Sequence, residues 1–297
     1  MKTLAVNLWS LFKLRISFAI MLCTLAGAAV ATAPAAGGPI GIEGPAAWQV
    51  ALLALAVLLS SASAGAFNHY VERDLDATMS RTRGRPFVTG YFKHGPLWLS
   101  AILGLLLVAV TLAGLATNWA AAGYVFLGAF VYGVVYTVWL KQRSWTNIVL
   151  GGLAGSFAVL AGAAAVDPGL SPVPVILAVV LFLWTPPHFW SLAMVLHQEY
   201  RQAGVPMLPV VHGDRVAAWA TLAHTVALVL LSLLPVFYGL GWIYLIGALA
   251  GGAVFTVKSV ALVRSPGTRA AAANFKASLL QLSLLLVAAL ADAWLIG

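Results

Sequence analysis

Nine apolar stretches, each about long enough to cross a lipid bilayer as a helix, constrain this chain more than any other feature. A helix needs about 20 mostly apolar residues to span the hydrocarbon. The stretches cover residues 16–35, 47–67, 97–117, 119–140, 146–166, 173–195, 216–238, 241–262 and 275–296. Helices satisfy their own backbone groups in lipid, and the alternation typical of barrel strands is absent. We therefore expect an all-α, polytopic membrane protein, a bundle of about nine helices around a central cavity.

The composition supports a membrane protein. The chain is 62% hydrophobic and 8% charged, with a mean hydropathy of +0.98, whereas soluble domains carry about a quarter charged residues. Its one cysteine, Cys23, excludes an internal disulfide and predicts a small buried side chain. We expect residues 1–297 to form a single integral-membrane domain.

The distribution of basic residues predicts the orientation. With nine spans, all 16 lysines and arginines fall on one side, and basic loops stay in the cytoplasm. The segments of that side are the N-terminus and residues 68–96, 141–145, 196–215 and 263–274. This predicts a multi-pass protein of the cell's plasma (inner) membrane, with its N-terminus cytoplasmic and its C-terminus outside. The net charge of +8 is spread over these segments, so the lipid bilayer is the expected partner and nucleic acid is not.

The first long loop holds an unusual concentration of charge. Seven charged residues lie between Phe67 and Pro86: Glu72, Arg73, Asp74, Asp76, Arg81, Arg83 and Arg85. If the second helix continues into the loop, Asn68, Glu72 and Asp76 share one face. Carboxylates that would repel each other indicate a hard cation such as Mg²⁺, completed by substrate phosphates. Asp74 lies on another face, where it joins a second ion or pairs with an arginine.

A cluster of basic residues follows these acids. Arg81, Arg83 and Arg85 precede a proline, and guanidinium groups bind phosphate oxygens through paired hydrogen bonds. Lys141 and Arg143, at the inner end of the fourth span, are placed to bind the same anion. The pattern predicts a Mg²⁺-bound diphosphate ligand, although an ordinary basic loop with solvated ion pairs is the alternative.

The sixth span and the loop after it, residues 196–215, carry the second set of candidates. Pro186 and Pro187 interrupt the helix beside His188, and irregular backbone at membrane depth is tolerated where it lines a cavity. Aromatic residues flank the histidine: Trp184, Phe189 and Trp190. A flat apolar ligand suits such a pocket, where His188 would bind a metal, move protons or simply form a hydrogen bond. Glu199 and Tyr200 lie at the inner surface, level with the first loop.

Both regions resemble a known family. "NHYVERDLDATMSRTRGRP" (68–86) with "YTVWLK" (136–141) resembles the UbiA superfamily of intramembrane prenyltransferases. "FLWTPPHFWSLAM" (182–194) followed by "YRQAGVPMLPVV" (200–211) is similar to a narrower group within it, which acts on haem. The resemblance implies transfer of the farnesyl group of farnesyl diphosphate to a vinyl group of haem B, with haem O and diphosphate as products. It also implies haem A synthase or haem-copper oxidase assembly as downstream partners.

The resemblance also implies residue roles. Asn68, Glu72 and Asp76 would bind Mg²⁺ and diphosphate, and the run Arg81–Arg85 with Lys141 would bind the diphosphate. His188 would belong to the haem side, within a haem and prenyl pocket whose aromatic candidates are Tyr136, Trp184, Phe189, Trp190 and Tyr200. The superfamily's second acidic motif has two aspartates four residues apart, whereas this chain has Glu199 and Ala203. Glu199 is therefore a candidate metal ligand, and the number of Mg²⁺ ions stays open.

Two alternatives remain at this stage. Another UbiA-type enzyme, with a quinone precursor or a chlorophyll-type molecule as acceptor, would keep the acidic residues but would not need the His188 pocket. A secondary transporter would also use interrupted helices. A transporter should carry charge near the bilayer midplane, and this chain keeps nearly all of its charge at one surface.

Overall fold

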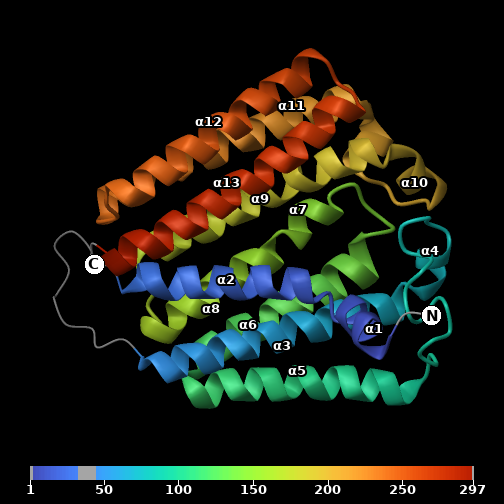
Figure 1. The fold of residues 1–297 in the computed structure, drawn as a ribbon, viewed down its shortest axis with the longest axis horizontal. Coiled ribbons are helices and arrows are strands. Elements are labelled where there is room, and N and C mark those ends of the chain that lie inside the picture. The colour runs from blue at the N-terminus through green and yellow to red at the C-terminus, as the bar shows by residue number, and fades with distance from the viewer. Residues whose placement is uncertain (1–2, 33–44, 296–297) are drawn as a thin grey trace.

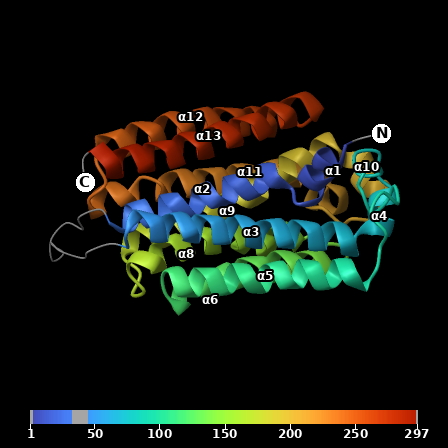
Figure 2. The ribbon, with the colours of Figure 1, turned by 60° about the horizontal axis from the view of Figure 1, so that its bottom comes forward.

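The computed structural model describes residues 3–32 and 45–295, which form helices and no strands. Within this described part, nine helical segments are long and apolar enough to cross a membrane. The axes of the long helices are roughly aligned, and successive helices go back and forth between the two ends of the molecule (Figure 1, Figure 2). The expected all-helical, polytopic membrane fold is confirmed.

The helices follow one another along the chain in this order. The first part contains α1 (Leu4–Leu11), α2 (Leu14–Ala31), α3 (Ala47–Val71), α4 (Arg73–Ala77), α5 (Pro96–Ala116), α6 (Trp119–Phe130) and the π-helix η1 (Val131–Leu140). The second part contains α7 (Asn147–Gly151), α8 (Leu153–Val166), α9 (Pro172–Val195), α10 (His197–Gln202), α11 (Leu208–Leu231), the 3₁₀-helix η2 (Leu234–Tyr238), α12 (Trp242–Arg264) and α13 (Thr268–Leu295).

Two spans begin earlier than the sequence predicts. The seventh begins at Leu208 instead of residue 216, and the ninth at Thr268 instead of residue 275. Both added segments are helical but carry polar residues, which hydropathy assigns to loops. Within α11 the helix bends at Gly213, whose φ of 83° lies in the left-handed region that favours glycine. The predicted ends at residues 33–35 and 296 lie outside the described residues.

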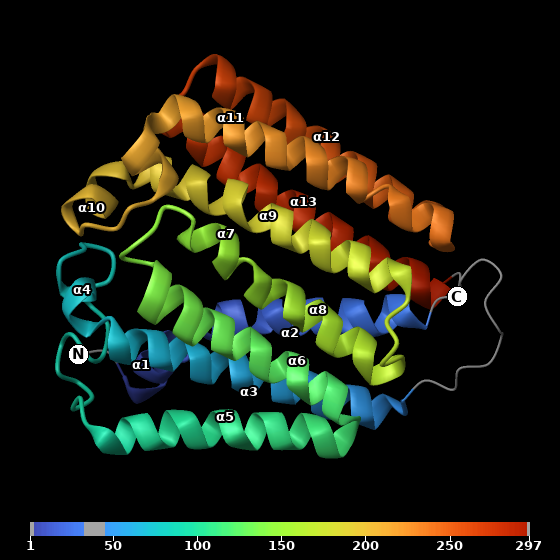
Figure 3. The ribbon, with the colours of Figure 1, turned by 180° about the vertical axis from the view of Figure 1, so that it is seen from behind.

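Four helices form the centre of the bundle. Helices α2, α8, α9 and α13 pack against one another, while α3, α5 and α6 lie on one flank and α11 and α12 on the other (Figure 1, Figure 3). Glycine allows the backbones of α2 and α8 to touch. A Cβ atom on Gly27 would overlap the carbonyl oxygen of Val159, and one on Gly162 would overlap that of Thr24.

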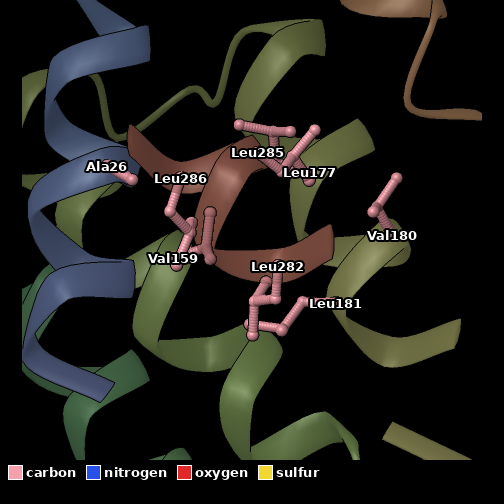
Figure 4. A pocket seen from close by; sticks show the side chains of 8 residues that line it. All are labelled: Ala26, Val159, Leu177, Val180, Leu181, Leu282, Leu285 and Leu286. Carbon is pink, nitrogen blue, oxygen red and sulfur yellow. The ribbon is translucent and has the colours of Figure 1, made fainter. Parts of the chain in front are cut away.

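A narrow apolar void lies where these four helices meet. Its volume is about 10 Å³, which is near the minimum for one water molecule. The lining side chains shown in Figure 4 are Ala26, Val159, Leu177, Val180, Leu181, Leu282, Leu285 and Leu286. Since none of them offers a polar partner, the void is expected to stay dry.

Buried polar groups connect the helices of the second half. Asn274 of α13 donates to Ser191 Oγ of α9 at 2.9 Å and accepts from Ser259 Oγ of α12 at 3.0 Å. Near the opposite end, Asp292 of α13 accepts the backbone N–H groups of Gly241 at 2.6 Å and Tyr244 at 3.1 Å. This carboxylate therefore caps the N-terminus of α12, where negative charge is favourable. These two hydrogen bonds explain why the Asp292 carboxylate is buried in the bundle.

Candidate active site at one end of the bundle

The two long loops meet at one end of the molecule. Helices α4 and α10 lie at the same end as α1 and away from the last turns of α13 (Figure 1, Figure 2). A direct contact joins the two loops, because Ser80 Oγ of the first loop donates to Glu199 Oε1 of the second at 2.5 Å. Residues more than a hundred positions apart thus form a single polar region.

The acidic residues of the first loop are buried on one face. Helix α3 ends at Val71, yet the backbone N–H of Glu72 still donates to the Asn68 carbonyl at 2.9 Å, and that of Asp76 to the Glu72 carbonyl at 2.7 Å. This continuation keeps the four-residue spacing. Asn68, Glu72 and Asp76 are 1%, 3% and 2% exposed. Asp74 instead points to solvent and pairs with the exposed Arg73 at 2.8 Å.

A different basic residue contacts each member of this buried face. Lys13 Nζ donates to Asn68 Oδ1 at 2.6 Å. Lys141 Nζ lies 2.5 Å from Glu72 Oε2, and Arg85 Nη1 lies 2.5 Å from Asp76 Oδ2. We call these three pairs of residues the ion cluster. Glu72, between α3 and α4, and Asp76 of α4 provide its negative charge, and three bases from other segments provide its positive charge.

The π-helix η1 sets the position of Lys141 and of the aromatic residues beside the ion cluster. The Lys141 N–H donates to the Tyr136 carbonyl five residues earlier at 2.9 Å, the bonding pattern of a π-helix. Thr137 Oγ1 accepts from Asn68 Nδ2 at 3.0 Å and donates to the Tyr132 carbonyl at 2.8 Å. The rings of Tyr132 and Tyr136 stack with centroids 5.6 Å apart. Such π-bulges are frequent at functional sites.

Burial shapes the protonation of the ion cluster. It raises the pKa of the Asp76 carboxyl above its ordinary value, although the Arg85 guanidinium opposes this shift. It also lowers the pKa of the Lys13 ammonium, and the positive charge of Arg85 lowers it further. Burial also raises the pKa of the Tyr200 phenol, and the positive charge of Arg81 opposes this shift.

Three residues of this site have no recognisable signal in the sequence. Lys13, Tyr132 and Thr137 surround Asn68, and the Lys13 ammonium also donates to the Tyr132 hydroxyl at 2.9 Å. Lys13 reads as one of several basic residues before the first span. Its left-handed backbone (φ 46°, ψ 43°) separates α1 from α2, and no sequence pattern indicates that turn.

The other predicted basic residues lie farther out. Arg81 and Arg83 are exposed, and the positive charge of Arg81 lowers the pKa of the buried Tyr200 phenol against the effect of burial. Arg143 is also exposed, and its Nη1 donates to the carbonyls of Val138 at 3.0 Å and Trp139 at 2.9 Å. It caps the end of its own helix.

The aromatic candidates divide between two directions. Trp184 and His188 face α13, where the Trp184 indole donates to the Ser278 carbonyl at 2.8 Å. Trp190 instead meets the ring of His224 on α11 edge-on, with centroids 5.1 Å apart. Phe189 packs, as Tyr136 does, against a core cluster that contains Trp190 and Tyr200. It also contacts the His188 ring edge-on, with centroids 5.0 Å apart. Phe189 therefore lies between the His188 side of α9 and the core cluster that contains Trp190.

The donor set fits a hard divalent cation that a substrate helps to bind. Glu72 Oε1 and Glu199 Oε2 are buried without a hydrogen-bond partner, although buried carboxylate oxygens are normally satisfied. Within the described residues, no group of three His, Cys, Asp or Glu side chains could hold a metal unaided. One or two carboxylates with amide oxygen, water and substrate phosphate are the usual Mg²⁺ environment.

Comparison with known proteins identifies the family. The profile of the UbiA prenyltransferase family matches residues 20–285. A Protoheme IX farnesyltransferase 2 of Paramagnetospirillum magneticum is 58% identical over 97% of this chain and 97% of its own. A Protoheme IX farnesyltransferase of Hyphomonas neptunium is 43% identical over 86% of this chain and 79% of its own.

Solved structures share the fold at low sequence identity. A digeranylgeranylglyceryl phosphate synthase superposes with a TM-score of 0.78 at 18% identity, covering 97% of this chain and 98% of its own. A UbiA homolog from Archaeoglobus fulgidus, bound to DMAPP and Mg²⁺, gives a TM-score of 0.64 at 17% identity, covering 94% and 99%. With the ion cluster at one end of such a bundle, the chain belongs to the UbiA prenyltransferase family and is an intramembrane prenyltransferase, related to the protohaem IX farnesyltransferases.

Proposed function

We propose that this enzyme transfers the farnesyl group of farnesyl diphosphate to a vinyl group of haem B in a Mg²⁺-dependent reaction. Diphosphate leaves, the vinyl carbon forms the new carbon–carbon bond, and one water molecule supplies the hydroxyl of the product, haem O, with release of a proton. The observation that carries the proposal is the ion cluster, in which buried oxygens on one helix face meet lysine and arginine. The names of the relatives support haem as the acceptor, and the DMAPP and Mg²⁺ in the Archaeoglobus homolog support a metal-bound diphosphate.

The chain's own residues suit departure of a diphosphate. Asn68, Glu72 and Asp76 would hold Mg²⁺, with Glu199 a further ligand from the second loop. Asp74 is not part of the proposed set, because it is turned to solvent. Bound there, Mg²⁺ would act as a Lewis acid on the leaving group. In this proposal Lys141, Arg85 and Lys13 add fixed positive charge at the same place, and charge already in position needs no reorganisation during the reaction.

Aromatic rings beside the ion cluster suit the allylic cation that remains when diphosphate departs. Lys141 Nζ lies 5.8 Å from the centroid of the Tyr136 ring, so that ring borders the place where the carbon–oxygen bond would break. π faces attract cations, and the apolar surroundings exclude water. On the acceptor side we propose His188 with Trp184 and Phe189. Trp190 is turned toward α11 and is the least suited of the candidates.

We further propose that the chain works as one catalytic unit in the plasma membrane, with the ion cluster on the cytoplasmic side. Support comes from the basic loops, which all fall on one side of nine spans. A maleimide that does not cross membranes should label Gly169→Cys in intact cells and Gly84→Cys only after permeabilisation. The native Cys23 is buried and gives little background. The reverse labelling would overturn the orientation.

The reaction is tested with purified enzyme in lipid nanodiscs. The enzyme is incubated with haem B, farnesyl diphosphate and Mg²⁺, and the extracted haems are analysed by mass spectrometry while released diphosphate is measured. We expect haem O and diphosphate in equal amounts, and neither when Mg²⁺ is omitted and EDTA is present. Unreacted haem B, together with prenylation of a quinone precursor offered in parallel, would overturn haem as the acceptor.

A further inference from the structure

Both faces of the His188 ring are covered by other rings. The imidazole stacks on Trp184 at 4.4 Å between centroids, with 18° between the planes. On its other face it stacks on Phe275 of α13 at 4.4 Å and 26°. A porphyrin therefore cannot stack on this histidine, and a ligand can approach only the edge of the ring.

The hydrogen bonds of Ser278 determine which edge atom is free. The Ser278 hydroxyl donates to the Phe275 carbonyl at 2.7 Å, and a hydroxyl has only one hydrogen to give. When that hydrogen is given to the Phe275 carbonyl, the 2.8 Å contact with His188 Nδ1 is a bond that Nδ1–H donates. The neutral imidazole then carries its lone pair on Nε2. Among the described residues, none makes a hydrogen bond with Nε2.

We propose that Ser278 is a positioning residue, which holds His188 in the Nδ1–H tautomer so that Nε2 binds the iron of the haem substrate. This inference rests on the proposed function. A histidine that binds a metal almost always donates its other ring N–H to an acceptor, which fixes the tautomer and the ring orientation. Ser278 serves as that acceptor, and its carbonyl also anchors the Trp184 indole at 2.8 Å.

The position of Ser278 is itself fixed by the packing of α13. One turn earlier, Asn274 bonds to Ser191 of α9 and to Ser259 of α12. Both Asn274 and Ser278 are fully buried. These polar contacts fix the register of α13 against α9. They thereby fix the position of the Ser278 hydroxyl relative to the His188 ring.

The test is a titration of nanodisc-embedded full-length enzyme with haem B in the absence of prenyl substrate. Soret absorption gives the affinity, and the ferric EPR spectrum reports the axial ligand. We expect Ser278→Ala to weaken haem binding about 10- to 100-fold, as loss of a ligand's hydrogen-bond partner typically does, and to alter the EPR signal. Ser278→Thr, which keeps the hydroxyl, should restore both. His188→Ala should lose the imidazole-type spectrum, and added imidazole should bring it back.

Controls separate this role from a loss of packing. Ser156→Ala removes another buried serine, on α8, whose hydroxyl donates to the Ala178 carbonyl of α9 at 2.7 Å, and should leave haem binding unchanged. Ser278→Cys replaces the alanine variant if that variant does not fold, because a thiol is a weak acceptor.

Each remaining outcome has a defined meaning. Wild-type affinity and spectrum in Ser278→Ala, with loss in His188→Ala, would overturn the role of Ser278. An unchanged spectrum in His188→Ala would overturn iron binding by this residue, while haem O formation by the wild type would still support the proposed function. A wild-type enzyme that neither binds haem nor forms haem O would instead defeat the proposed function.

Discussion

Lys141 and Glu72 meet across 69 positions of sequence, with 2.5 Å between Nζ and Oε2. The two side chains are 14% and 2% exposed, so little solvent screens their attraction. Removing one partner of a buried ion pair costs about 3–5 kcal/mol, because the other charge stays buried. The pair therefore bears on both folding and the proposed binding of diphosphate.

We expect Lys141→Met to reduce turnover by about a hundredfold or more, as removal of a preorganised charge-stabilising group does. It should also lower the thermal stability of the protein, because Glu72 loses its close partner. Turnover is measured as haem O formation in nanodiscs, and stability by thermal unfolding. Lys93→Met, which removes an exposed lysine of the first loop, serves as the control. Equal turnover in the two variants would contradict the role of Lys141.

Asp76 and Asp74 form a matched pair for testing the acidic face. Asp76 is buried and bound to Arg85, whereas the side chain of Asp74 is 87% exposed. We expect Asp76→Asn to abolish haem O formation while the protein remains folded in the membrane, and Asp74→Asn to keep nearly normal activity. Wild-type activity of Asp76→Asn with excess Mg²⁺ would remove Asp76 from the proposed metal site.

The pH dependence of stability follows from Asp76. Burial raises the pKa of its carboxyl above the ordinary 3.8, so the folded protein binds this proton more tightly than the unfolded chain does. The stabilising contribution is complete below the ordinary value and is lost as the pH rises through the raised pKa. Without Mg²⁺, the midpoint temperature of thermal unfolding should therefore fall as the pH rises from the ordinary value of 3.8 through the raised pKa of Asp76.

Two comparisons assign that pH effect to Asp76. Asp76→Asn cannot ionise at this position, and its unfolding midpoint should fall less with pH than that of the wild type. Mg²⁺ with inorganic diphosphate should restore stability at the higher pH, because the bound cation favours the carboxylate. Parallel pH profiles for wild type and variant would show that another group is responsible.

Asp292 should prove structural. Its carboxylate accepts two backbone N–H groups at the start of α12, and loss of such a cap costs about 1 kcal/mol. We expect Asp292→Ala to unfold at lower temperature but to keep its activity per folded molecule. Asp292→Asn, which retains an acceptor oxygen, should be less affected. A loss of turnover without a loss of stability would point to a functional role.

The sequence predicts much of the fold because hydropathy and length report directly on membrane spans. It locates nine spans, and it errs at α11 and α13, where polar residues such as Asp214 lie within helix. The predicted interruption at Pro186 and Pro187 is also wrong, because α9 continues as one helix through both prolines. Four-residue spacing likewise predicts that Asn68, Glu72 and Asp76 share a face. Spacing cannot reveal contacts between distant segments, so Lys13 and Ser278 are recognised only from the packed structure.

The ion cluster is built entirely from residues 13 to 141. A ribosome makes a chain from its N-terminus, so every charged partner of Glu72 and Asp76 has been synthesised before His188 is added. The first four spans can thus neutralise their own buried charge while the remaining helices are still being inserted. When the later helices pack against the first four spans, the buried carboxylates of Glu72 and Asp76 already have their basic partners.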